Sequence, residues 1–248
     1  MTGASPVLRW RNAGRRIMRV GKYAAGHSAW SLPILFRLTP EGTDRQITDD
    51  TAMVVEGFPR SGNTYTTFAL KLLAGRSIHI ASHAHHPGQV KLGLAKGLPT
   101  LVVVRPPVDT LASYLIAGPH GTPGMVLREY RYYHRAISRL GDDLMLATFD
   151  QVTGDTGGLA RRLNERHSLG LDERTPDETD EAAIVVSIDR HFERVHTPAD
   201  IGMLARPDNS RDDLNRHWRE QLTRSKHAGV LADCNALYDN LARHATDT

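Results

Sequence analysis

The segment at residues 57–67, GFPRSGNTYTT, constrains the fold more than any other part of the chain. It begins one residue after the apolar run at residues 53–55, and an apolar run before a glycine-containing loop is typical of a strand that leads into a phosphate-binding loop and a helix. The segment fits the motif G-x-x-x-x-G-K-[ST] at every fixed position except one, because Asn63 stands where that motif has lysine. It therefore predicts an anion site on an α/β fold. It leaves open whether the ligand is a nucleoside triphosphate.

The predicted elements alternate between strands and helices along the chain. Strands are expected at residues 51–55, 101–104 and 144–149, and helices at residues 64–73, 109–116, 126–140, 159–166, 178–194 and in two stretches beyond residue 211. This alternation predicts a parallel sheet that helices cover on both faces. The length of 248 residues, of which 40% are hydrophobic, fits one such domain over residues 46–248 after an extension at residues 1–45. The single cysteine, Cys234, excludes an internal disulfide.

The positive charge of the chain is concentrated at its N-terminus. Residues 1–40 carry seven lysines and arginines and no acidic residue, so the rest is mildly acidic although the formal net charge is +3. On a helical wheel, residues 7–24 place apolar side chains on one side and basic ones on the other. This helix, within residues 6–24, either packs on its own domain or lies on an anionic membrane surface. We expect a cytoplasmic protein that does not bind nucleic acid, with membrane association at the surface in the second case.

A second constellation lies at residues 102–114, VVVRPPVDTLASY. Arg105 follows a predicted buried strand, and Ser113 lies eight residues further on, inside the next helix. Together they could bind a second phosphate, the arginine by its charge and the serine through its hydroxyl. A nucleoside triphosphatase would need an acidic Mg²⁺ ligand at the end of such a strand. The arginine at this place argues against a metal–triphosphate site.

The two segments together resemble the P-loop-fold sulfotransferases, which use 3′-phosphoadenosine 5′-phosphosulfate as sulfuryl donor. Their 5′-phosphosulfate loop reads approximately P-[KR]-S-G-T-T-[WY], which residues 59–65 match except at Asn63. Their 3′-phosphate motif reads approximately R-x-P-x-D-x-x-x-S, which residues 105–113 match. The resemblance covers residues 53–114. It implies a single-domain, P-loop NTPase-like, three-layer α/β/α fold with a central parallel sheet.

The resemblance also implies an activity and a role for individual residues. The activity is sulfuryl transfer, without a metal, to a hydroxyl or amine of a small-molecule, carbohydrate or lipid acceptor. Arg60 would stabilise the charge on the leaving 5′-phosphate, and Arg105 and Ser113 would bind the 3′-phosphate. Tyr65 aligns with an aromatic residue that stacks on adenine, although a packed core aromatic is the alternative. The remaining donor-binding candidates are Ser61, Gly62, Asn63 and Thr64 in the loop and Arg211 near the C-terminal helices.

The catalytic base is expected among four histidines at residues 79–86. Relatives commonly place this histidine in a K-T-H-x-P-like segment. His85 fits H-x-P here and is the first candidate, with His83 and His86 as alternatives. A neutral imidazole near physiological pH is a suitable base. Two other interpretations stay open, namely a metal site and an exposed loop, but no acidic residue or cysteine joins these histidines nearby.

Two other classes of function also stay open on the sequence. One is a kinase-like P-loop NTPase that lacks the lysine of its motif. The other is a non-catalytic nucleotide-binding module. Binding of 3′,5′-adenosine bisphosphate, compared with ATP–Mg²⁺, distinguishes the first class from a sulfotransferase.

Overall fold

A parallel β-sheet forms the centre of the protein. We describe it from a computed structural model that covers residues 45–118, 121–195 and 211–247, so the predicted N-terminal helix lies outside the described residues. Within these ranges the sheet has four strands in the order β2-β1-β3-β4, and every pairing is parallel. Their bounds are β1 Thr51–Gly57, β2 His79–Ser82, β3 Thr100–Val104 and β4 Met145–Thr148.

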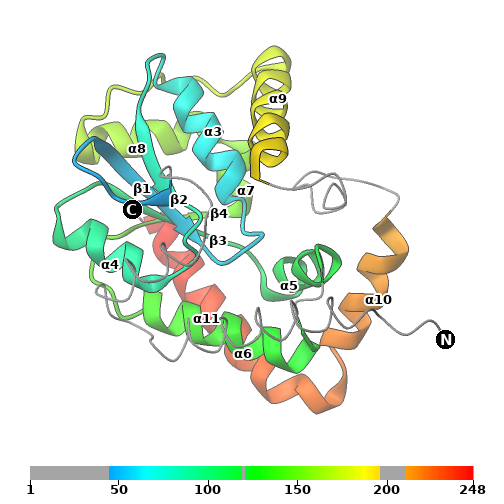
Figure 1. The fold of residues 1–248 in the computed structure, drawn as a ribbon. Helices are drawn as coiled ribbons and strands as arrows, with labels where there is room; N and C mark the ends of the chain where they lie inside the picture. The colour runs from blue at the N-terminus through cyan, green and yellow to red at the C-terminus, as the bar shows by residue number, and fades with distance from the viewer. Residues whose placement is uncertain (1–44, 119–120, 196–210, 248) are drawn as a thin grey trace.

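Helices cover both faces of this sheet, which gives three layers (Figure 1). Alternate strand residues face opposite layers: Val102 and Val104 pack with the α5, α6 and α11 side, whereas Leu101 and Val103 pack with the α3, α7 and α8 side. The helices are α3 Asn63–Leu73, α4 Pro87–Ala95, α5 Pro107–Ile116, α6 Pro123–Ile137, α7 Phe149–Gly154, α8 Thr156–His167, α9 Glu178–Val195, α10 Asp212–Leu222 and α11 Ala228–Asp247, with a short 3₁₀ turn at Ser225–His227.

The prediction of a parallel sheet covered on both faces is confirmed. Each strand predicted from an apolar run is present, with ends that differ by one or a few residues. The structure corrects the prediction between residues 79 and 95, where it adds β2 and α4, so that the strand at Thr100–Val104 is third and not second. The strand β2 has only four residues, HIAS, of which two are apolar, and that is too short for a periodic pattern.

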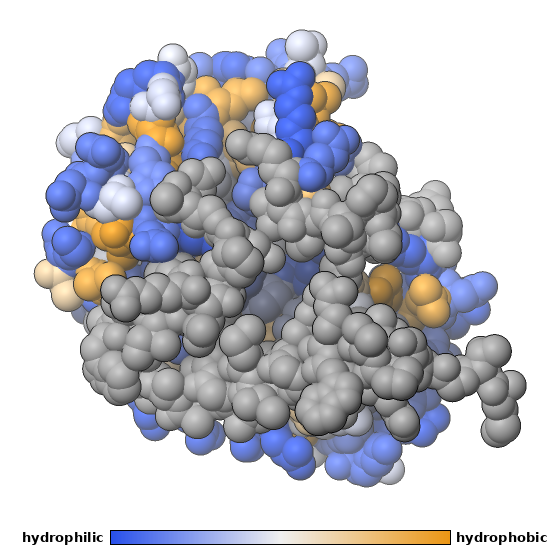
Figure 2. Space-filling view, viewed as in Figure 1, coloured by the Kyte–Doolittle hydropathy of each residue, from blue (hydrophilic) through white to orange (hydrophobic). Residues whose placement is uncertain are grey.

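On the face shown in Figure 2, outside the grey atoms, hydrophilic side chains dominate and apolar groups form separate patches. Over the part of the chain that the structure describes, no helix combines the length and the apolarity needed to cross a membrane. Exposed large apolar side chains include Val185 and Val186 on α9 and Leu214 on α10.

One titratable side chain, His134 on α6, is fully buried beside the core aromatics Phe58 and Tyr133. Its ring stacks on that of Tyr130, with centroids 3.8 Å apart, and its Nδ1–H donates to the Tyr130 carbonyl oxygen at 2.9 Å. Its Nε2 atom is buried and has no hydrogen-bond partner in the described ranges. Burial therefore lowers the pKa of His134 from 6.5 to about 4, although the hydrogen bond from its ring to the backbone acts in the opposite direction.

This buried imidazole predicts a specific loss of stability in acid. Between pH 6.5 and pH 4 the unfolded chain binds a proton at His134 that the folded chain does not, so the free energy of unfolding falls as the pH falls. The free energy of unfolding falls by about 3 kcal/mol between these two pH values because of this one side chain. We expect urea unfolding of His134→Leu to depend less steeply on pH than unfolding of the wild type. Equal slopes for the wild type and His134→Leu would contradict a neutral buried imidazole.

Candidate active site

The candidate residues gather where the parallel strands end. Because all four strands run in the same direction, their carboxyl ends lie at one edge of the sheet, where α/β proteins commonly bind ligands. The loop of residues 58–62 follows β1, the histidine segment at residues 83–86 follows β2, and Arg105 follows β3. The strand β1 lies between β2 and β3, so its loop has the histidines on one side and Arg105 on the other.

Asn63 closes the loop that follows β1. Its side-chain amide donates to the carbonyl oxygen of Gly57 at 3.1 Å, and the same nitrogen lies 3.4 Å from the carbonyl oxygen of Phe58. The Asn63 side chain and the backbone of β3 lie very close to Gly57. A Cβ on Gly57 would lie 2.4 Å from Asn63 Oδ1 and 2.6 Å from the carbonyl oxygen of Val103. Glycine is therefore required at position 57. The amide that replaces the lysine of the triphosphatase motif ties the two ends of the loop together, which the sequence did not reveal.

The loop leads into the N-terminus of α3. Gly62 is the N-cap residue and has a left-handed conformation with φ 102°, which favours glycine. It has no side chain to cap the helix, so the first N–H groups of α3 are available to another acceptor and the helix dipole makes that end attractive to an anion. Beside this helix start the hydroxyl oxygen of Ser61 is buried and has no hydrogen bond within the described ranges. These features together could accept an anionic group.

The two sequence motifs meet at Arg60. Its Nε–H donates to the hydroxyl oxygen of Ser113 on α5 at 3.0 Å, and its carbonyl oxygen accepts a hydrogen bond from Arg105 Nη1 at 3.1 Å. The guanidinium of Arg105 lies over the ring of Phe149, 4.1 Å from its centroid, at the start of α7. The structure thus joins the loop after β1 and the segment after β3 into one site.

Positive charge accumulates at this site. Burial, followed by the charges of Arg211 and Arg105, lowers the pKa of Arg60 to about 10, so its guanidinium still carries a charge at neutral pH. Burial also lowers the pKa of Arg105, which the charge of Asp109 opposes and that of Arg219 reinforces. Arg211 is the N-cap residue of α10, a helix that packs on α5. Although it is distant in sequence, Arg211 therefore lies close enough to Arg60 for its charge to act on it, and its role in donor binding stays a prediction.

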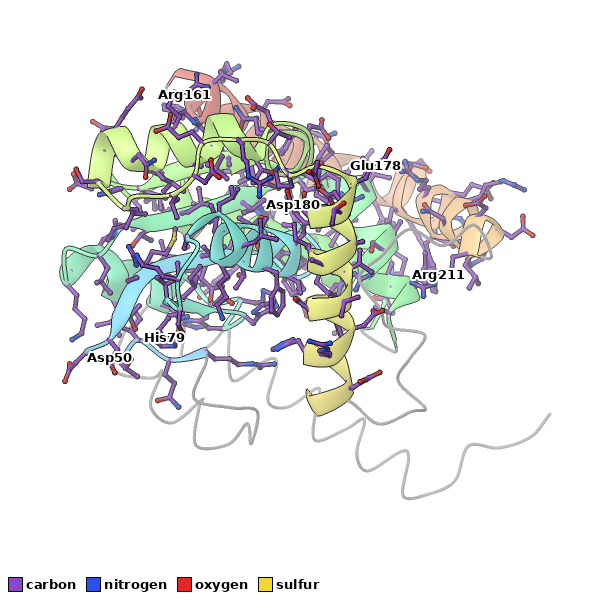
Figure 3. The ribbon with its side chains drawn as sticks, turned by 90° about the horizontal axis from the view of Figure 1, so that it is seen from above. Asp50, His79, Arg161, Glu178, Asp180 and Arg211 are labelled. Carbon is purple, nitrogen blue, oxygen red and sulfur yellow. The ribbon has the colours of Figure 1, made fainter. Side chains whose placement is uncertain are left out.

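The four predicted histidines occupy different places. His79 begins β2, where its Nδ1 lies 3.0 Å from the hydroxyl oxygen of Thr51 at the start of β1, and Figure 3 shows it on the opposite side of the molecule from Arg211. His86 is buried and caps α4, since its Nδ1 accepts a hydrogen bond from the backbone N–H of Gly88. Among the residues that the structure describes, no three histidine, cysteine or acidic side chains are grouped so that they could hold a metal ion.

His83 and His85 lie beside the loop, with ring centroids 5.8 Å apart. The Nε2 of His83 lies 2.9 Å from the hydroxyl oxygen of Thr64, and its Nδ1 is hydrogen-bonded to the hydroxyl of Ser82, so both ring nitrogens of His83 are engaged. Burial, followed by the charges of His85 and His191, lowers the pKa of His83 well below 6.5. His83 is therefore a neutral side chain that joins β2 to α3.

His85 has the ring orientation that a base requires. Its Nδ1 lies 2.9 Å from the carbonyl oxygen of Gly57, which can only accept a hydrogen bond, and 3.2 Å from the amide nitrogen of Asn63, which can only donate one. Because that amide already donates to the backbone carbonyl oxygens of Gly57 and Phe58, the proton is assigned to Nδ1 of His85. The lone pair of the neutral ring is then on Nε2. His85 is half-buried, unlike His86, which is almost fully buried. Of the three histidines considered as a base, His85 fits the role best.

Tyr65 lies on the side of α3 that faces α9. Its hydroxyl donates to the carboxylate of Glu181, and its half-buried ring packs against the apolar cluster that includes Ile184 and Ile188. Burial, with the hydrogen bond to Glu181, raises the pKa of Tyr65 to about 12. The structure therefore shows the packed aromatic that the sequence offered as an alternative, and stacking on adenine stays a prediction.

Several residues of the site were not found by sequence reasoning. The carboxylate of Glu56 contacts the histidine segment, Phe149 supports Arg105, and His191 on α9 stacks on His83 with centroids 5.6 Å apart. Only Glu56 gave a signal in the sequence, because it is a charged residue between the apolar run at residues 53–55 and Gly57. The other two depend on contacts between distant segments.

Comparison of the chain with protein-family models found no match, and comparison with curated proteins found none at a significant level. The description of the protein therefore depends on its own fold and site. It is an α/β protein with a central parallel sheet, and the start of α3 and a cluster of arginines lie at the edge where the strands end.

Proposed function

We propose that the protein is a sulfotransferase that moves a sulfuryl group from 3′-phosphoadenosine 5′-phosphosulfate to a hydroxyl or amine of an acceptor. The observation that carries this proposal is the junction of the two motifs, in which Arg60 contacts both Ser113 and Arg105. A ligand with one anionic group at the start of α3 and a second one at Arg105 would use both parts of this site. The order of strand, loop and helix in a parallel sheet also supports a P-loop NTPase-like fold for the domain.

The residues present fit the donor. Its 5′-phosphosulfate would lie at the start of α3, where the helix amides and the buried, unpaired hydroxyl of Ser61 can donate to phosphate oxygens. Its 3′-phosphate would lie near Arg105 and Ser113, with Arg211 as a further cation. ATP carries all of its phosphates on the 5′ side, so it would leave the second group of donors unused.

His85 and Arg60 would share the chemical step. His85 Nε2 would take the proton of the acceptor hydroxyl while the acceptor oxygen forms its bond to sulfur. The bond between sulfur and the bridging oxygen breaks in the same step, and its electron pair stays on the 5′-phosphate. Arg60 would stabilise the negative charge that develops there. The products are the sulfated acceptor, adenosine 3′,5′-bisphosphate and a protonated His85.

Nucleotide binding tests the proposal before an acceptor is known. We expect adenosine 3′,5′-bisphosphate to raise the melting temperature by several degrees and to bind in calorimetry at least about tenfold more tightly than ATP–Mg²⁺. Adenosine 5′-phosphate serves as the control that lacks the 3′-phosphate. Tight binding of ATP–Mg²⁺ without a response to the bisphosphate would instead support a P-loop NTPase. Tight binding of the bisphosphate without sulfuryl transfer in an acceptor screen would point to a binding module.

A further inference from the structure

Glu56 is a buried carboxylate at the end of β1, directly before Gly57. Its Oε1 accepts hydrogen bonds from the backbone N–H of Ala84 at 2.9 Å and from the side-chain amide of Gln89 at 3.1 Å. Its Oε2 accepts the backbone N–H of His85 at 2.9 Å. The same amide of Gln89 also donates to the carbonyl oxygen of Arg45. The carboxylate thus binds the segment after β2 through both of its oxygens.

That segment has an unfavourable backbone conformation. His83 and His85 have φ values of 64° and 49°, in the left-handed region that side chains other than glycine rarely adopt. A segment keeps such a conformation only when its surroundings hold it there. Hydrogen bonds from backbone amides to an ionised carboxylate are stronger than those between neutral groups. Glu56 therefore supplies interactions that oppose relaxation of the segment.

The conformation has a direct consequence for the candidate base. With its backbone N–H bound to Glu56, His85 presents Nδ1 to the carbonyl oxygen of Gly57, the residue that follows Glu56 in β1. Glu56 thus holds the backbone of His85, and Gly57 holds its ring. The shorter ring contact, to the Gly57 carbonyl oxygen, favours the tautomer with its lone pair on Nε2, although the amide nitrogen of Asn63 lies 3.2 Å from the same Nδ1.

We propose that Glu56 is a positioning residue that fixes the orientation and tautomer of His85 by holding the backbone of residues 84 and 85. The inference rests on the proposed function, because it takes His85 as the base. It assigns Glu56 no contact with the donor. Both of its oxygens are needed for the geometry: a glutamine in its place could accept at one oxygen only, and its NH₂ group would face the other backbone N–H.

Nuclear magnetic resonance on Glu56→Gln tests this role without an acceptor. In the wild type we expect the ¹⁵N shifts of the His85 ring to show a single tautomer protonated at Nδ1. In Glu56→Gln we expect those shifts to move toward the average of two tautomers, and amide exchange at Ala84 and His85 to become at least about tenfold faster. Thr67→Val is the matched control, because it removes a buried hydroxyl on α3 that has no hydrogen bond within the described ranges.

The test separates this inference from the proposed function. The dissociation constant of adenosine 3′,5′-bisphosphate should change by less than about threefold in Glu56→Gln, because Arg60 and Arg105 are untouched. A wild type that does not bind the bisphosphate would overturn the sulfotransferase proposal, whatever the His85 spectra show. Unchanged His85 ring shifts in folded Glu56→Gln would overturn the positioning role. If Glu56→Gln does not fold, amide exchange in the wild type decides: protection of at least about 100-fold at Ala84 and His85 supports the role, and exchange as fast as in an unstructured peptide overturns it.

Discussion

Arg105→Ala is expected to weaken binding of adenosine 3′,5′-bisphosphate by about 10- to 100-fold, the usual effect of losing a hydrogen bond to a charged group. Binding of adenosine 5′-phosphate should change by less than about threefold. The reason is the position of Arg105 beside Ser113 and Arg60, on the far side of the loop from the histidines. Calorimetric titration of both nucleotides into both proteins measures the difference.

The variant needs controls for its structural contacts, because Arg105 also donates to the Arg60 carbonyl and packs on Phe149. Arg105→Lys keeps the charge but loses the forked geometry of the guanidinium, so we expect an intermediate loss for the bisphosphate. Arg135→Ala, at an exposed position of α6, should leave both affinities unaltered. An equal loss for the two nucleotides in Arg105→Ala would show that Arg105 only supports the loop and does not bind the 3′-phosphate.

Gly57→Ala is expected to lower the free energy of unfolding by about 1–3 kcal/mol, as overpacking of a close contact does, and to reduce bisphosphate binding severely. The added Cβ would lie 2.4 Å from Asn63 Oδ1 and 2.6 Å from the Val103 carbonyl oxygen. One of these groups must move, and both define the loop. Urea unfolding and the bisphosphate titration measure the two effects.

Gly229→Ala is the matched control for this change. Gly229 lies in α11, and a Cβ there would meet no atom within 4 Å. Alanine in a helix is favoured over glycine by up to about 1 kcal/mol, so this variant should be as stable as the wild type or more stable. A Gly57→Ala protein with wild-type stability and affinity would mean that the loop tolerates a wider path than the structure shows.

Sequence reasoning succeeded where the signal is local. The strands β1 and β3 are apolar runs bounded by glycine or proline, and each is followed directly by its polar functional residues, so strand, loop and helix could be placed from a short window. Because both strands are parallel, their ends meet at one edge, where Arg105 contacts the carbonyl oxygen of Arg60. The burial of Tyr65 against α9 could only be offered as an alternative.

Other features of the fold and the site depend on contacts that a short stretch of sequence does not reveal. The strand β2 is too short to give a pattern, and its pairing with β1 makes it a strand. The contact by which Asn63 closes the loop could not be predicted without knowing the path of the loop. Along that path the amide of Asn63 donates to the carbonyl oxygen of Gly57. The Tyr65–Glu181 pair joins residues 116 positions apart. Glu56 was visible as a charged residue after an apolar run, but its partners were not.

The cluster of Arg60, Arg105 and Arg211 links the stability of the fold to the ions in the solvent. These side chains repel one another in the folded chain, which contributes to the low pKa of Arg60, and unfolding separates them. Any anion that binds among them therefore favours the folded state, and its concentration enters the melting temperature directly. Phosphate or sulfate in a buffer would thus compete with a nucleotide for these charges and raise the baseline stability. The same arginines make the choice of buffer a variable of every binding experiment on this protein.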